Sequence, residues 1–283
     1  LDPEDFGEFD EFGVWRPIKY AGSYTGNSFY LKFDAADVDG DSSGLGNDWT
    51  ANNFTTSGTG TDVMSDTPTT NWCTWNSVYR TQGTGVATYA DGNLNYSQNV
   101  NAYKRGMGTI GVSSGKWYFE VDVITRSGST PVMGIGIAES SVNGGPSAAK
   151  SYAYHYTGQK YTPSLASYSG NSYGAGDMIG VAMDLDNGTV ECFKNGTSQG
   201  TLVSSLPAGT YHPTIYTYGT HEVIANFGQR DFEQTVPTGY LPLNTANLAA
   251  PTVKDGSKNF NTVLYTGDNT NNRTITGVGF QPD

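Results

Sequence analysis

The chain has 283 residues and a formal net charge of −12, from 27 acidic and 15 basic residues. This charge repels phosphate backbones and anionic lipid surfaces, so nucleic acid and membranes are poor candidates for partners. Aromatic residues make up 13% of the chain, more than disordered chains carry, and the 37 glycines indicate many tight turns. The two cysteines, Cys73 and Cys192, exclude a disulfide framework, and we expect Cys192 to be a buried free thiol.

Runs of alternating apolar and polar residues, bounded by Gly, Asn and Asp, recur along the chain, whereas helical periodicity is absent. This pattern predicts an all-β protein. We expect an N-terminal extension over residues 1–24 and a β-sandwich over 25–235, with its core motifs in 110–230. A proline-containing linker over 236–258 follows, and then a β segment over 259–283 that either adds to a neighbouring domain or begins a further one.

The first predicted strand covers residues 28–34, where Phe29, Leu31 and Phe33 share one face. Residues 49–99 are rich in Thr, Asn, Ser and Gly, which favours long loops and edge strands. Their aromatic residues are expected to pack onto the sandwich. These are Trp49, Phe54, Trp72, Trp75 and Tyr79.

The clearest strand covers residues 116–125, in which Trp117, Phe119, Val121 and Val123 alternate with more polar side chains. Asn187-Gly188 and Asn195-Gly196 predict hairpin turns, because a type I′ turn needs two residues that tolerate positive φ. The remaining predicted strands are 133–138, 177–185, 189–194, 212–218 and 222–227.

Five motifs stand in order across the middle of the chain: Gly115-Lys-Trp-Tyr-Phe-Glu-Val121, Gly134-Ile-Gly-Ile-Ala138, Gly176-Asp-Met-Ile-Gly-Val-Ala-Met-Asp-Leu-Asp-Asn-Gly188, Phe193-Lys-Asn-Gly196 and Asn226-Phe-Gly228. Their order and spacing resemble the successive strands of the SPRY domain. The resemblance implies a concanavalin-like antiparallel β-sandwich. It also implies a module that binds peptides or other ligands through its loops without catalysing a reaction.

A wider resemblance sets the context. Phe29-Tyr-Leu-Lys-Phe33, Gly46-Asn-Asp-Trp-Thr50 and the segment from Thr238 to Leu248 are similar to bacteriophage tail-fibre or adhesin proteins that embed such a domain. We therefore expect a non-enzymatic structural protein on a virion surface or outside the cell. Its partners would be further copies of itself, other virion proteins, or a glycan or protein on a host surface. A lectin-like carbohydrate-binding module is the alternative, and a jelly-roll glycoside hydrolase is a third reading.

An acidic cluster in a Gly- and Ser-rich loop offers oxygen ligands at alternate positions, as Ca²⁺ requires. It departs from the EF-hand pattern because Ser42 stands where that loop has glycine and no flanking helices are predicted. A solvated acidic turn is therefore the alternative to a calcium site. The cluster comprises Asp34, Asp37, Asp39, Asp41 and Asp48, of which the last four are the candidate ligands.

Glu120 and Asp122 share a strand face, as the two carboxylates of a glycosidase must. Glycosidases of concanavalin-like fold carry a further Glu on that strand, where this chain has Ile124-Thr125-Arg126. The three histidines, His155, His212 and His221, have no second histidine at metal-binding spacing. We therefore assign no catalytic residue.

Tyrosines concentrate in the connection between two predicted strands and at a later turn. Long loops of a rigid sandwich often carry recognition, and tyrosine gives contact area with a hydrogen-bonding end. The alternative is a loop that packs down on the sheet or against a copy of itself. The connection holds Tyr152, Tyr154, Tyr156, Tyr161, Tyr168 and Tyr173. The candidates for ligand contact are Tyr152, Tyr154, Tyr156 and Tyr161, with Tyr216, Tyr218 and His221 at the turn.

Overall fold

The computed structural model describes residues 1–11, 13–67, 69–79, 87–142, 146–250, 252–269 and 271–279. Within these ranges the secondary structure is thirteen β-strands and two short 3₁₀ helices. The all-β prediction is confirmed. Among the described residues no helix is long and apolar enough to cross a membrane.

The chain forms two compact units, Leu1–Ser23 with Ala249–Asp283 and Tyr24–Leu248. The first contains η1 (Pro3–Asp5), a hairpin of β1 (Gly7–Phe9) and β2 (Trp15–Pro17), and η2 (Gly256–Lys258). The β segment predicted over 259–283 is wrong for its described residues, 259–269 and 271–279, which contain no strand. Leu264 there is fully exposed, so the alternating pattern has no apolar surface to pack against. The predicted domain boundaries stay predictions.

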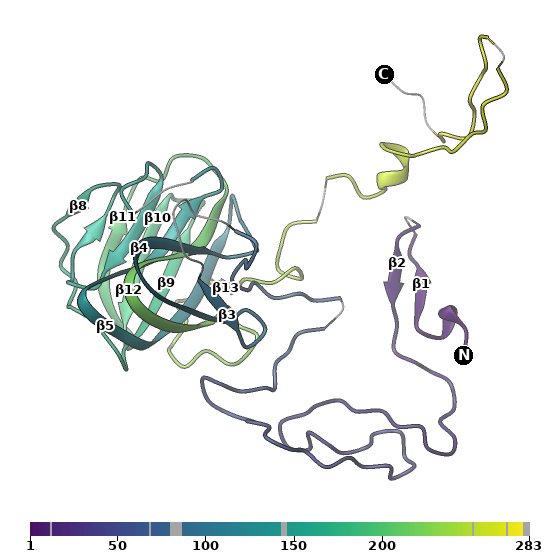
Figure 1. Ribbon diagram of the computed structural model, residues 1–283, viewed down its shortest axis with the longest axis horizontal. Helices are drawn as coiled ribbons and strands as arrows, with labels where there is room; N and C mark the ends of the chain where they lie inside the picture. Colours follow the sequence, from purple (N-terminus) through teal and green to yellow (C-terminus); the bar gives the residue numbers. More distant parts are fainter. Residues whose placement is uncertain are drawn as a thin grey trace. The chain divides into compact units, whose positions relative to one another are not determined.

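The larger unit contains an eleven-stranded sheet, ordered β11-β10-β9-β5-β12-β4-β3 along its main path (Figure 1). The chain β6-β7-β8 branches from β5, and β13 is parallel to β5 while the other pairs are antiparallel. The strands are β3 (Thr88–Ala90), β4 (Asn95–Met107), β5 (Lys116–Glu139), β6 (Ser151–His155), β7 (Lys160–Tyr161), β8 (Leu165–Ala166), β9 (Met178–Asp184), β10 (Thr189–Lys194), β11 (Thr197–Val203), β12 (Tyr211–Asn226) and β13 (Leu241–Pro242).

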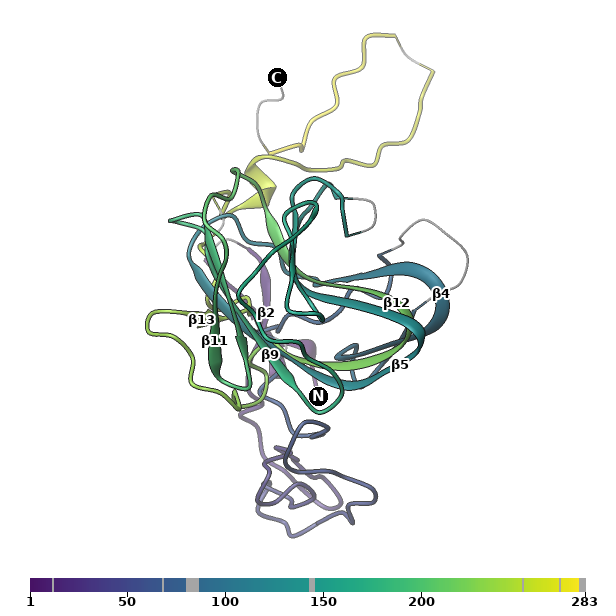
Figure 2. The same cartoon turned by 90° about the vertical axis from the view of Figure 1, so that its left-hand side faces the viewer.

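Two pairs of predicted strands are each one long strand. Residues 116–125 and 133–138 both belong to β5. Residues 212–218 and 222–226 both belong to β12, which ends one residue before the predicted end at Phe227. The sequence predicts a turn between residues 218 and 222, but the structure has a bulge there: Tyr218 pairs with Val132 while Thr220 pairs with Ser127. Only Gly219, with φ of 96°, stands opposite the extra residues of β5. A bulge keeps the strand direction and increases its bend, so β5 and β12 curve together (Figure 2).

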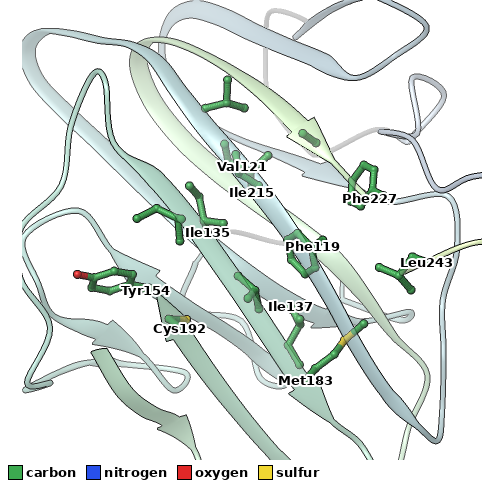
Figure 3. Packing of buried hydrophobic residues seen from close by; sticks show 14 of the residues in the cluster. Phe119, Val121, Ile135, Ile137, Tyr154, Met183, Cys192, Ile215, Phe227 and Leu243 are labelled. Atoms are coloured by element: carbon green, nitrogen blue, oxygen red, sulfur yellow. The ribbon is translucent and has the colours of Figure 1, made fainter. Parts of the chain in front are cut away.

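The curved sheet closes over one hydrophobic core. Phe119 and Val121 come from the first half of β5, and Ile135 and Ile137 come from its second half. Figure 3 shows all four in the same packed cluster. The face predicted for Trp117, Phe119, Val121 and Val123 is buried throughout, which confirms the alternation. Because β5 is bent, its two halves supply side chains to the same core from both layers of the sandwich.

One of the two predicted type I′ turns forms. Asn195 and Gly196 both have positive φ, of 48° and 77°, and join β10 to β11. Between β9 and β10 only Gly188 is left-handed, and the connection spans four residues because Asp184 pairs with Thr189. Gly188 is therefore the last residue of a four-residue loop and not part of a two-residue type I′ turn.

The strand predicted over residues 28–34 is wrong. The structure has only isolated bridges there, Leu31 with Asp41 and Asp34 with Asp37. Phe33 has φ of 56°, which breaks an extended backbone, and both Phe29 and Phe33 are about half exposed. Farther along, Trp75 is fully buried against Phe227, as predicted for the 49–99 aromatic residues.

Two further aromatic residues of that segment, Trp49 and Phe54, are about half exposed and do not pack as predicted. Cys73 and Cys192 are both buried free thiols, which confirms the expectation for Cys192. Burial raises the pKa of the Cys73 thiol to about 11, so it stays protonated at neutral pH.

Candidate binding pocket

A pocket of about 560 Å³ opens where β5 begins to bend. Its wall comes from four separate segments: β5, the two residues that follow β6, the loop before β9, and the end of β10. We call it the Arg126 pocket. It is lined by Arg126, Tyr156, Thr157, Ser172, Tyr173, Gly174, Asp177 and Lys194.

Arg126 is the partly buried cation of this pocket. Its guanidinium carbon lies 4.2 Å from the centroid of the Tyr156 ring, a cation–π contact, and its Nη1 donates to the Pro131 carbonyl at 3.1 Å. Its Nε is buried and has no hydrogen-bond acceptor. None of the acidic residues in the described ranges lies within ion-pair distance of it.

The neighbours of Arg126 across the sheet are neutral. His221 of β12 pairs with Arg126, and Gln98 of β4 pairs with His221, so the three side chains share one face. His221 Nε2 lies 2.9 Å from the Tyr218 carbonyl and must carry a hydrogen, because a carbonyl oxygen only accepts. Burial lowers the pKa of His221, and the charge of Arg126 adds to this effect. The sheet therefore supplies no anion for Arg126.

A second cation in the pocket already has a partner. Lys194 Nζ lies 3.2 Å from an Asp177 oxygen and donates to the Ser172 carbonyl at 2.8 Å. Asp177 also accepts from the Gly174 N–H at 2.9 Å and from the Asn195 amide at 2.9 Å. Burial acts to raise the pKa of Asp177, but these hydrogen bonds and Lys194 outweigh it and hold that pKa below its ordinary value. Asp177 is therefore ionised at neutral pH and neutralises Lys194.

A larger hollow, of about 780 Å³, lies between residues 32–35, 56–65 and 229–233. Of the two cations that line it, Lys32 is exposed, and Arg230 is already engaged by Asp122 at 2.9 Å and by Glu233 at 2.7 Å. The Arg126 pocket is the better candidate site because its central charge has no such partner.

The tyrosines predicted for ligand contact are mostly interior. Tyr156 lines the Arg126 pocket, and Tyr218 is partly exposed against Tyr103. For these two, ligand contact stays a prediction. The other five are buried. Three lie in the connection, which packs down on the sheet as the alternative interpretation proposed, and two lie on β12, where His221 lines a separate hollow of about 360 Å³. For these residues too, ligand contact stays a prediction. They are Tyr152, Tyr154, Tyr161, Tyr216 and His221.

The acidic loop does not gather its carboxylates. Asp41 accepts hydrogen bonds from Tyr30, Ser43 and Asn47, and the Ser43 hydroxyl is the main cause of its lowered pKa. Asp48 accepts from the Asp41 N–H, and Asp39 accepts from the Ala51 N–H. The described residues contain no group of three or more His, Cys, Asp or Glu side chains that could hold a metal ion, so the structure gives no support to the calcium site predicted over Asp37, Asp39, Asp41 and Asp48.

Glu120 and Asp122 also have structural partners. Glu120 is fully buried and accepts from the backbone N–H groups of Glu233 and Gln234, at 3.0 and 2.9 Å. Asp122 pairs with Arg230. A glycosidase needs its two carboxylates in an open cleft, and these two instead hold the turn at residues 229–234 against β5.

Sequence reasoning missed most of the pocket. Arg126 drew notice only as the residue in place of a glycosidase carboxylate, and Gly174, Asp177 and Lys194 carried no site signal. These residues lie on separate segments, so no local spacing joins them. The one available signal for this site was Arg126 itself, a basic residue at the end of an alternating β-strand pattern in an acidic chain.

Comparison with known proteins identifies the sandwich. Residues 116–230 match the family model of the SPRY domain. The resemblance to the SPRY domain is therefore confirmed for these residues. The crystal structure of the SPRY domain of human HERC1 aligns with a TM-score of 0.47 and 16% identity, over 51% of this chain and 94% of that one.

Curated relatives match over 130 residues, which is 44% of this chain. Ran-binding protein 9 of Danio rerio is 38% identical and Ran-binding protein 10 of Danio rerio is 36% identical, each covered to 21%. Ran-binding protein 9 of Homo sapiens is 37% identical and covered to 17%. The chain thus spans about a fifth of the length of these relatives.

These relatives overturn the predicted context. They are Ran-binding proteins, so the expected bacteriophage tail fibre or adhesin, and the location on a virion surface or outside the cell, are wrong. The flanking segments that suggested this context are short and lie outside the SPRY match. The expected virion partners and host glycan also lack support. SPRY domains mediate protein–protein interaction, which agrees with the expectation of a protein partner.

Proposed function

We propose that the SPRY domain of this chain is a protein-interaction module that holds a segment of a partner protein in the Arg126 pocket. The observation that carries the proposal is Arg126 itself, a partly buried guanidinium without a carboxylate partner. A desolvated cation without an anion is costly, and a partner that supplies one gains binding energy there.

The surroundings of the pocket favour binding by a preformed site. Arg126 is fixed by the Tyr156 ring and the Pro131 carbonyl, so little side-chain freedom is lost when a ligand binds. Lys194 and Asp177 are likewise held by several contacts. The volume is in the ordinary range of about 300–1,000 Å³ for small ligand sites, enough for one or two side chains of a peptide.

The hydroxyl groups of the pocket are not arranged as activated nucleophiles. Thr157 Oγ1 donates to the Gln159 side-chain oxygen at 2.9 Å and lies 2.7 Å from His155 Nδ1. With the hydroxyl proton directed at Gln159, the tautomer of His155 that fits is the one that donates to Thr157, and in that arrangement His155 does not act as a base toward the hydroxyl. This arrangement supports binding over turnover.

Selection of a random peptide library on the 283-residue chain tests the proposal. We expect binders whose affinity falls at least about tenfold in Arg126→Gln. Arg16→Gln is the matched control, because Arg16 is an exposed arginine of the N-terminal hairpin. Binders that are equally insensitive to both substitutions would place the interaction elsewhere, and a failure to select any binder would count against the module itself.

A further inference from the structure

Resting on the proposed function, we infer that the group recognised in the Arg126 pocket is a single carboxylate, an Asp or Glu side chain of the partner. This carboxylate accepts from the edge of the Arg126 guanidinium that Pro131 leaves free. Arginine is suited to this role because its planar donors match the two oxygens of a carboxylate.

The donors of Arg126 determine where the carboxylate binds. Pro131 accepts from Nη1, and the Tyr156 ring covers one face of the guanidinium. The Nε has no acceptor although it is buried, and a buried donor left unsatisfied opposes folding. A carboxylate beside the guanidinium supplies the negative charge that Arg126 lacks. Because the Nε is buried, the carboxylate reaches that nitrogen only when the surrounding side chains shift to admit it.

The charges around Arg126 favour a ligand group that carries a single negative charge. Lys194 and Asp177 cancel one another, and the pKa values of His155 and His221 are both lowered by burial, with Arg126 adding to the effect. Both histidines are therefore neutral at pH 7, and the pocket has one net positive charge. A carboxylate matches it, whereas a phosphate monoester, with about −1.5 to −2 charges, leaves an excess of negative charge.

Gly174 keeps the approach to the guanidinium open. A methyl group at residue 174 would lie 3.8 Å from Arg126 Nε and within 4 Å of no other atom outside the adjoining residues. The φ of Gly174 lies outside the left-handed region, so alanine fits its backbone. Gly174→Ala therefore partly fills the space beside Arg126 without straining the loop, which makes it a steric probe of the site.

Acetate is the probe for this inference. We would titrate the whole chain with sodium acetate at constant ionic strength and follow the Arg126 Nε–H and Gly174 N–H signals by NMR. We expect saturable shifts that disappear in Arg126→Gln and require at least about tenfold more acetate in Gly174→Ala. Arg126→Lys should retain part of the affinity, because it keeps the charge but loses the planar pair of donors. Thermal melting of each variant establishes that it is folded.

Acetamide and inorganic phosphate are the matched controls, the first neutral and the second more highly charged. No saturable shift with acetate, an equal shift with acetamide, or tighter binding of phosphate than of acetate would overturn the inference. Failure of the inference is distinguishable from failure of the proposed function. Library peptides that need Arg126 but contain no acidic residue would remove only the carboxylate. Acetate binding without any Arg126-dependent peptide would remove only the proposed function.

Discussion

The buried carboxylate of Glu120 accepts a hydrogen bond at 3.0 Å from the backbone N–H of Glu233, a residue 113 positions later in the chain. Together with the bond from Gln234, this contact holds the turn at residues 229–234 against β5. The carboxylate that invited a catalytic interpretation is thus a structural anchor.

We expect Glu120→Ala to lower the free energy of unfolding by about 2–3 kcal/mol, because two partly buried N–H groups and the buried Tyr118 hydroxyl lose their acceptor. Urea unfolding measures the loss, and hydrogen exchange at the amides of Glu233 and Gln234 localises it. Glu8→Ala, at an exposed position of β1, is the control and should change little. Slow exchange at both amides in Glu120→Ala would show that the turn has another anchor.

Acid should weaken the fold as the buried histidines resist protonation. Burial lowers the pKa of His155 to about 4, with Arg126 adding to the effect, whereas the unfolded chain titrates near 6.5. Between these two pH values the unfolded state binds more protons than the folded state. The stability contributed by neutral His155 is therefore fully present above about pH 6.5 and is lost as the pH falls toward 4. We expect His155 to account for a loss of about 2 kcal/mol in the unfolding free energy between about pH 7 and about pH 5.

Urea unfolding at the two pH values measures this loss, and His155→Asn should reduce it. His212 and His221, whose pKa values are also lowered by burial, act in the same direction and remain in the variant. An unchanged pH dependence in His155→Asn would mean that His155 is not the group responsible.

Arg126→Gln should raise the pKa values of both His155 and His221, because the charge of Arg126 contributes to lowering each of them. NMR titration of the imidazole signals measures this change, and Arg16→Gln is again the control. If neither pKa moves, Arg126 is more strongly screened than its position implies, and the charge argument for the pocket fails.

The bend of β12 depends on Gly219. Its φ of 96° is poorly accessible to alanine, and the Pro131 backbone lies 3.4 Å from the position of an added Cβ. We expect Gly219→Ala to cost about 1–3 kcal/mol, measured by urea unfolding. Gly60→Ala, where an added Cβ meets nothing within 4 Å, is the control and should cost far less. Equal effects of the two substitutions would remove the special role of this glycine.

Substitutions at two phenylalanines compare the buried face of β5 with residues 28–34, the segment wrongly predicted as a strand. Phe119→Ala should destabilise the domain by about 3–5 kcal/mol, because Phe119 is fully buried. Phe29→Ala should cost much less, because Phe29 is 45% exposed. A comparable loss at Phe29 would restore the predicted packing of residues 28–34. Both are measured by the free energy of unfolding in urea.

The sequence predicts the sandwich well where alternation is strict. Trp117 to Val123 alternate over one buried face, and the Asn195-Gly196 turn supplies two residues that accept positive φ. Alternation fails at residues 28–34, because it cannot report that Phe33 is left-handed or that no neighbouring strand is available. It also cannot distinguish a turn from a bulge at Gly219, since both need a glycine.

The pocket was less predictable than the fold. Tyr156 was selected because tyrosine favours recognition loops, and it lines the pocket. The same reasoning also selected Tyr154, which the fold buries completely. Arg126 gains its significance only from the absence of a nearby carboxylate, which depends on how distant strands pair. No local pattern carries that information.

Chemical-shift mapping of the whole chain with the tightest peptide from the library tests the central claim most directly. The account predicts that the largest shifts fall on Arg126, Tyr156 and Gly174, and that replacing one acidic residue of the peptide by its amide abolishes them. A bound peptide that leaves the signals of these three residues unchanged would contradict the account.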